Sequence, residues 1–263
     1  MIKRVVNTYE VEVAKAVRRK FTYLGPALMV LAVCCGPAMR PIARDGMSDY
    51  AFIAYVTPMA LNLLGLLMLL MYCAGLIASE LGNGSICFTL LRPVRRHEYL
   101  LAKLLLGMSY ATVLTATVAV TSWLLTYAFG ELTGVTWGGA VTYTHIDMLR
   151  SYVCGALLVQ LPLWAAAAFA IMVSTLTSSA GAAVAATVGV WILVDMAKHP
   201  LHMAPCLFSS YLETPWRVFV NHCDGIPAPW FPDTIYVIAT SVVSIAVFTT
   251  VSVSVLARRD LHT

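Results

Sequence analysis

Long apolar runs separated by short polar segments dominate the chain from residue 21 onward. Six of these runs reach the roughly 20 residues that a helix needs to cross a hydrocarbon core of about 30 Å. They cover residues 21–39, 51–78, 100–129, 148–173, 180–196 and 234–256. Because they are too long and too rich in Leu, Ala and Val for barrel strands, they predict an all-α, polytopic membrane protein with six transmembrane helices. Pro58 and Pro162 are the predicted kink points.

Composition and charge agree with this pattern and orient it. Apolar residues make up 60% of the chain, charged residues 11%, and the mean hydropathy is +0.80. Twelve of the 17 basic residues fall at the two termini and in the second and fourth loops. The positive-inside bias therefore predicts a multi-pass protein of the inner or plasma membrane with both termini cytoplasmic. The net charge of +4 reflects this topology, and we expect no nucleic-acid partner.

Residues 1–20 have the pattern of an amphipathic helix on the membrane surface, held by membrane lipid. The expected apolar face comprises Ile2, Val6, Tyr9, Val13, Ala16 and Val17. The expected polar face comprises Lys3, Arg4, Asn7, Lys15 and Arg18, and it offers a contact for a cytoplasmic partner. A cleaved signal peptide is the alternative, but Glu10 and Glu12 would sit in its basic region. We therefore treat 1–263 as a single transmembrane domain.

Residues 79–99 form the predicted cytoplasmic segment between the second and third spans. Gly82, Asn83 and Gly84 allow a sharp turn, because Gly and Asn tolerate positive φ. Ser85 can cap a short, half-apolar helix that ends before Pro93. Arg92, Arg95 and Arg96 follow as a basic collar, and Lys103 is expected to snorkel to the lipid headgroups. The alternative is that these arginines serve only topology and lipid contact.

Polar residues within the spans are few. Asn62, Gln160 and Asp195 are candidates for a translocation path, although Asn and Gln also bridge packed helices. Gly181, Ala185 and Gly189 form a small-residue stripe on the fifth span. Such a stripe lets another helix approach closely, inside the subunit or between subunits.

Residues 197–233 form a long extracytoplasmic loop rich in Pro and aromatic residues, typical of the outer membrane interface. Imidazole and thiolate groups gather in it as candidate zinc or copper ligands: His199, His202, Cys206, His222 and Cys223. A disulfide between Cys206 and Cys223, or no joint role for these residues, are the alternatives, and the disulfide and the metal site exclude each other.

No motif of a catalytic site is found. The chain has no GxxxxGK[ST] loop and no GxSxG elbow, and the HE pair at His97 and Glu98 lacks the second His because position 101 is Leu. We therefore predict no catalytic residues and no cofactor bound by this chain.

The segment 79–103 resembles a signature of the permease subunits of type-2 ATP-binding-cassette (ABC) transporters. The matching positions are Glu80, Gly84, Ser85, Leu90, Leu91, Pro93, Val94, Arg95, Arg96 and Lys103. The ending at Leu256, Arg258, Arg259 and Asp260 is similar to the usual end of that family. Ser85 replaces the more usual Thr, and Arg95 replaces a common Ser.

This resemblance implies the permease subunit of an ATP-driven exporter. A separate ATPase subunit would hold ATP and Mg, and a second permease subunit, identical or paralogous, would complete the path. The short helix 85–91 would be the coupling helix. The implied ATPase-coupling residues are Glu80, Gly84, Ser85, Phe88, Leu91, Arg92, Arg95 and Arg96.

Two other classes stay open at this point. One is a membrane enzyme acting on a lipid-linked substrate, and the other is an ATP-independent channel or metal-handling protein. The apolar spans suit a lipid, an amphipathic drug or peptide, or a hydrophobic cofactor as substrate, and they equally suit ordinary packing.

Overall fold

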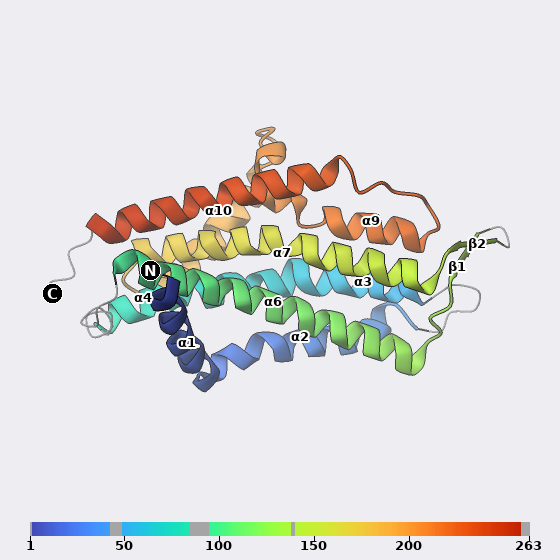
Figure 1. The fold of residues 1–263 in the computed structure, drawn as a ribbon, viewed down its shortest axis with the longest axis horizontal. Coiled ribbons are helices and arrows are strands. Elements are labelled where there is room, and N and C mark those ends of the chain that lie inside the picture. Colours follow the sequence, from blue (N-terminus) through green and yellow to red (C-terminus); the bar gives the residue numbers. More distant parts are fainter. Residues whose placement is uncertain (1, 43–48, 85–94, 138–139, 259–263) are drawn as a thin grey trace.

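A computed structural model describes residues 2–42, 49–84, 95–137 and 140–258. Within them the chain forms an elongated helical bundle (Figure 1). The helices are α1 (Ile2–Arg18), α2 (Lys20–Met39), α3 (Tyr50–Met59), α4 (Leu66–Gly82), α6 (Arg96–Phe129), α7 (His145–Leu176), α8 (Ala180–Ala197), α9 (Thr214–Cys223) and α10 (Asp233–Arg258). A π-helical turn, η1 (Ala60–Gly65), joins α3 to α4. Two short 3-10 helices, η2 (Ala204–Cys206) and η3 (Phe208–Tyr211), and the antiparallel strands β1 (Val135–Trp137) and β2 (Ala140–Tyr143) complete the described elements.

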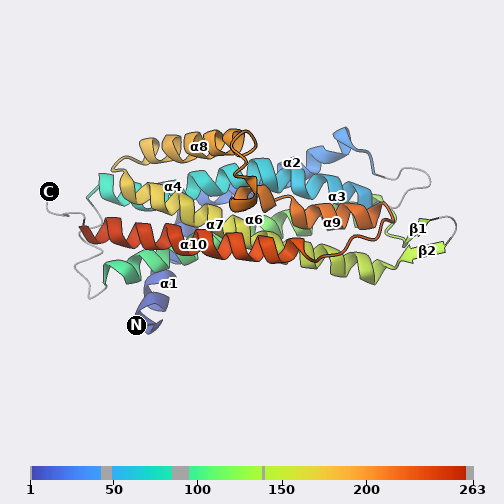
Figure 2. The same cartoon turned by 90° about the horizontal axis from the view of Figure 1, so that it is seen from above.

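The predicted membrane architecture is confirmed. Six helical segments of the described chain are long and apolar enough to cross a membrane: α2, α3–η1–α4, α6, α7, α8 and α10. Figures 1 and 2 show α1 and the C-terminal end of α10 at one end of the bundle and the β1–β2 pair at the other. We call these the α1 end and the hairpin end. The fold is that of a multi-pass α-helical membrane protein.

Helix α7 lies at the centre of the bundle and packs against α4, α6, α8, α9 and α10. Its run Ala165–Ala168 is buried, and such small side chains let neighbouring helices approach closely. By contrast, α8 buries only Ala183 and Thr187 and contacts α4 along one edge. The periphery of the bundle is apolar, as a surface in contact with lipid requires; Leu124, Leu157 and Leu193 are each more than 60% exposed.

The second span is interrupted where a kink was predicted. Pro58 lacks a backbone N–H, and its ring crowds the preceding helical turn. The wider turn η1 begins two residues later and contains Asn62. Helix α7, by contrast, continues through Pro162 as a single helix.

The N-terminal amphipathic helix is present as α1, but its inward face differs from the predicted one. Val5, Glu12 and Ala16 are buried, whereas Val6 is 44% and Val17 54% exposed. The reason is that α1 lies across α6 at a steep angle (Figure 1) and packs on it through this narrower stripe. The Tyr9 hydroxyl shares a hydrogen bond of 2.6 Å with Ser109 of α6.

The segment 197–233 contains more helical structure than the predicted loop. It contains η2, η3 and α9, and α9 packs on α3 and α7 near the hairpin end. Trp216 and Phe219 of α9 are 2% and 0% exposed and contact Tyr152 of α7 through their rings. The predicted aromatic residues therefore serve in part as core, where burial of each large ring contributes about 2–3 kcal/mol.

Candidate functional site

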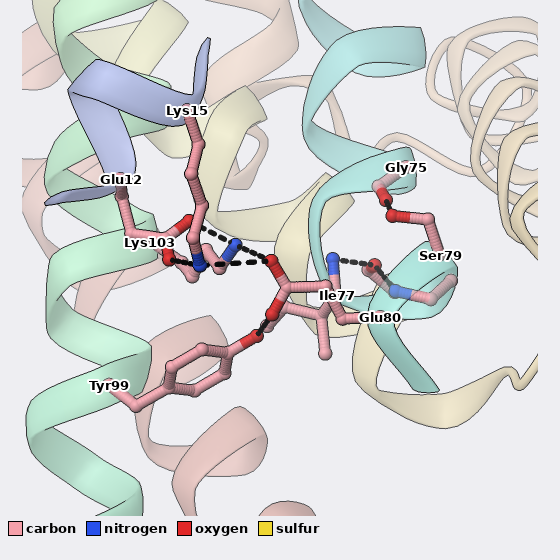
Figure 3. Close-up of polar contacts among 10 residues, drawn as sticks. Glu12, Lys15, Gly75, Ile77, Ser79, Glu80, Tyr99 and Lys103 are labelled. Atoms are coloured by element: carbon pink, nitrogen blue, oxygen red, sulfur yellow. Dashed lines mark hydrogen bonds and ion pairs between the residues drawn. The ribbon is translucent and has the colours of Figure 1, made fainter. Parts of the chain in front are cut away.

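A buried cluster of charged side chains lies at the α1 end, where three helices meet (Figure 3). Glu12 comes from α1, Glu80 from the last turn of α4, and Lys103 from the second turn of α6. Their residues are 2%, 5% and 1% exposed, respectively. Tyr99 precedes Lys103 by one helical turn on the same face of α6 and is fully buried.

The contacts place Lys103 between two carboxylates. Its Nζ donates to Glu80 Oε1 at 2.6 Å and also to Glu12 Oε2. The Tyr99 hydroxyl donates to the other oxygen, Glu80 Oε2, at 2.6 Å. Lys15, at the rim with 40% of its side chain exposed, donates to Glu12 Oε1 at 2.6 Å and lies 4.0 Å from Glu80 Oε1. Both oxygens of each carboxylate therefore have a donor.

The charges of the cluster balance as two opposite pairs. Glu80 and Lys103 form a neutral pair between α4 and α6, and α1 adds Glu12 together with Lys15. Burial alone would raise the pKa of Glu12, but the charges and hydrogen bonds of Lys103 and Lys15 outweigh burial and lower that pKa. Because a buried charge without its partner costs several kcal/mol, the cluster specifies one arrangement of the three helices.

We expect the docking of α1 to weaken in acid. A lowered pKa means that the ionised Glu12 carboxylate contributes stability in full above the ordinary glutamate pKa of 4.5, and this contribution is lost as the pH falls through the lower, folded-state value. Hydrogen exchange of α1, corrected for intrinsic rates, should therefore accelerate between about pH 5 and about pH 3. In Glu12→Gln protein this pH dependence should disappear. Identical profiles in both proteins would contradict the role of the ion pair.

The predicted cytoplasmic segment, residues 79–99, contains two members of this cluster, Glu80 near its start and Tyr99 at its end. Gly84 has φ +65°, so the predicted turn after α4 is confirmed. Ser85, Phe88, Leu91 and Arg92, with the whole predicted coupling helix 85–91, lie outside the described residues.

The two described arginines of the collar have different surroundings. Arg95 is exposed and caps α6, and its backbone N–H donates to Glu98 Oε2 at 3.0 Å. Arg96 reaches the end of α10 and donates to the carbonyl oxygens of Leu256 and Ala257 at 2.9 and 3.0 Å. A guanidinium at this position compensates the partial negative charge of a helix C-terminus. Arg96 thus has a packing role that the sequence did not indicate.

Lys103 was expected to snorkel to the headgroups, and this prediction is wrong. Its ammonium group is buried because two carboxylates provide the partners that lipid headgroups or water would otherwise supply. Glu12, Lys15 and Tyr99 were not predicted as site residues. A signal was present for Glu12: it stands three residues after Tyr9 and four before Ala16, in the middle of the apolar face.

The three polar candidates within the spans do not come together. Gln160 accepts from the Thr112 hydroxyl at 3.2 Å and so bridges α7 to α6. Asp195, near the end of α8, pairs with Lys198 at 2.6 Å and is partly exposed. Asn62 in η1 lines a groove between α3 and α9, and its buried Oδ1 has no hydrogen-bond partner among the described residues.

The five metal-ligand candidates are not assembled into a site. Within the described residues, which include all five, no group of three or more His, Cys, Asp or Glu side chains has the arrangement of a metal site. His222 is instead buried beside α7, where its Nδ1 accepts from Ser151 at 2.8 Å and its Nε2 donates to the Ala228 carbonyl at 3.1 Å.

The candidate disulfide is not formed either, because Cys206 and Cys223 are both free thiols. Cys206 is exposed in η2, whereas Cys223 ends α9 and its Sγ donates to the Tyr50 carbonyl at 3.7 Å. Burial, together with the nearby Asp224, raises the pKa of the Cys223 thiol and keeps it protonated at neutral pH. A protonated thiol that faces α3 is suited neither to metal binding nor to disulfide exchange.

The protein is thus a multi-pass helical membrane protein whose N-terminal helix is held against its second and third spans by the buried cluster. Residues 33–262 match the model of a family described as "Protein of unknown function (DUF2705)", and the chain belongs to this family. The match begins inside α2, covers the other five spans in full and leaves out α1, which contributes Glu12 and Lys15 to the cluster. No curated protein matches the chain.

Proposed function

We propose that this chain is the permease subunit of an ATP-driven exporter, coupled to a separate ATPase that holds ATP and Mg. The observation that supports the proposal most is the buried cluster. Glu80 stands just before the segment 83–95 and Tyr99 and Lys103 just after it, so the cluster joins both ends of this segment to α1. A force applied to the segment by a docked ATPase would move α1, α4 and α6 together.

In the proposed orientation, the α1 end lies on the cytoplasmic side of the cell membrane. Basic residues concentrate at this end among the described residues: Lys15, Arg18, Arg19, Lys20, Arg95, Arg96 and Arg258. The positive-inside bias favours this orientation. Exposed basic groups beside the segment 83–95 would also suit an acidic surface on the partner.

The test of coupling uses Glu80→Gln and Arg95→Glu in complexes purified from native membranes with their ATPase. Glu80→Gln keeps an acceptor for Tyr99 but removes the charge that faces Lys103, and Arg95→Glu reverses an exposed charge beside the segment. We expect ATP hydrolysis to continue while export falls about tenfold or more in each variant. Arg150→Glu, which reverses an exposed charge in the second turn of α7 near the hairpin end, is the matched control and should leave export unchanged.

A purified chain that lacks any associated ATPase yet turns over substrate without ATP would refute the proposed function. Such a result would favour the membrane enzyme or the ATP-independent channel. Unchanged export in both variants would remove the cluster and Arg95 from the coupling step.

The small-residue stripe of α8 is the proposed contact with a second permease subunit. A Cβ added at Gly181 or Gly189 would meet no atom within 4 Å, so these glycines are not used for packing inside the chain. If another subunit packs there, Gly189→Leu should overpack the contact and weaken dimer formation by about 1–3 kcal/mol. Single-molecule photobleaching in lipid vesicles would measure this equilibrium. Val190→Phe is the control, because Val190 is 42% exposed on the same helix and lies about 100° around the helix axis from Gly189; it should have little effect. Equal dimer stability in both variants would mean that the stripe faces lipid.

A further inference from the structure

A groove with two unlike walls runs between the second span and α9 near the hairpin end. Its volume is about 840 Å³, within the range of roughly 300–1,000 Å³ typical of ligand sites. Tyr50 at the start of α3 meets Cys223 at the end of α9, and Thr57 near the end of α3 shares the partner Tyr152 with Trp216 near the start of α9. The two helices are therefore antiparallel neighbours, as Figure 2 also shows.

One wall is a single apolar stripe of the second span. It consists of Ala51, Ala54, Tyr55, Pro58, Met59 and Leu63, with Asn62 beside the last of these. At a rise of 1.5 Å per residue, this stripe is roughly 18 Å long. Met59 and Leu63 are 44% and 62% exposed, so much of this apolar wall is uncovered in the chain alone.

The opposite wall is formed by α9 and its ends and has two sides. Trp216, Val220 and Cys223 form a buried and half-buried apolar side next to the second span, and exposed groups of both charge signs form the outer side. Glu213, Arg217 and Asp224 line it, and Arg40 stands across from them over the ring of Tyr55 at 5.8 Å. Among the described residues, none of these four charged groups forms an ion pair within 4.0 Å. Both charge signs are thus available to a ligand along the whole length of the groove.

The placement of apolar residues along one side of the groove and charged residues along the other favours one class of ligand. A lipid or detergent separates its polar and apolar parts end to end, whereas the groove separates them side by side. An extended peptide has this second arrangement, because successive side chains of a strand point to opposite faces. Side chains two residues apart are about 6.7 Å apart along a strand, close to the roughly 6 Å rise between Glu213 and Arg217.

We propose that this groove binds a short, extended amphipathic peptide of about five or six residues, with apolar side chains against the second span and alternating charges against α9. A basic residue would face Glu213 and an acidic one Arg217, and the long side chain of a second basic residue would extend toward Asp224, about 10.5 Å along α9 from Arg217. That the peptide is the exported cargo rests on the proposed exporter function; its binding does not.

The test measures fluorescence anisotropy of labelled synthetic hexapeptides on the purified full chain in lipid nanodiscs. The probe alternates Leu-Arg-Leu-Glu-Leu-Arg, and its matched control has the same composition in blocks, Leu-Leu-Leu-Arg-Glu-Arg. We expect the alternating peptide to bind about tenfold more tightly than the block peptide. Equal binding of the two peptides, or stronger competition by dodecylphosphocholine than by unlabelled alternating peptide, would overturn the proposal in favour of a lipid.

Variants of the groove test the same assignment. The charge exchange Glu213→Arg with Arg217→Glu should weaken binding of the probe about tenfold and restore binding to Leu-Glu-Leu-Arg-Leu-Glu, which shows that the variant is folded. Leu63→Trp should fill the apolar wall and weaken binding, whereas Leu157→Trp, on the exposed surface of α7, should not. Unchanged binding in Leu63→Trp, or loss of a dimer in that variant without any effect on the peptide, would overturn the proposal. None of these measurements requires the ATPase, so failure of the exporter function would leave their outcome standing.

Discussion

Replacing Lys103 by Met is expected to destabilise the protein by about 3–5 kcal/mol, because the change leaves two buried carboxylates facing each other without a cation. Glu12 and Glu80 are 2% and 5% exposed, so water cannot take the place of the ammonium group. Lys15 would remain near both, but at 40% side-chain exposure it holds only the rim of the cluster. The loss should appear in the unfolding midpoint in detergent and in faster hydrogen exchange of α1.

The control for this variant is Lys198→Met, which removes the partner of Asp195 at the end of α8. That ion pair is partly exposed, and its loss should cost only about 0–1 kcal/mol. The triple variant Lys103→Met, Glu12→Gln, Glu80→Gln should recover part of the stability, because it removes the unpaired charges together with the cation. Equal destabilisation by Lys103→Met and Lys198→Met would show that the ion pairs of the cluster contribute no more stability than a partly exposed ion pair.

The number and positions of the spans were predictable because a long apolar run in lipid can adopt few backbone structures. Each of the six spans is long and apolar enough to cross the membrane, and backbone groups in lipid must be satisfied within a helix. Helix α9 was not predicted, for a local reason. The prolines of residues 197–233 indicate a loop, but Pro215 stands in the first turn of α9, where Pro is favoured because its N–H is not needed.

The candidate site was predictable only in part. The position of Glu80 beside a turn was evident, but its partner Lys103 lies 23 residues after it and its neighbour Glu12 lies 68 residues before it. Such a pairing depends on how α1 crosses α6, and hydropathy carries no information on crossing angles. The sequence does show that two charged residues stand at positions where an apolar residue is expected. A glutamate on an apolar face and a lysine inside an apolar run each need a partner, and each is the partner of the other.

Replacing Gly82 by Ala is expected to destabilise the α1 end by about 1–3 kcal/mol. A Cβ at this position would lie 2.6 Å from the backbone oxygen of Ser178, between α7 and α8, and backbone cannot move aside as a flexible side chain can. The last turn of α4, which carries Glu80, would therefore have to shift away from α7.

Gly75→Ala is the matched control on the same helix, because its Cβ would meet no atom within 4 Å. It should stabilise the helix by about 0.5–1 kcal/mol through the lower entropy of the unfolded chain. Unfolding midpoints of the two variants, measured in one detergent, should thus move in opposite directions from the native value; a shift of the same sign in both would mean that the end of α4 is not held tightly against residues 177–179.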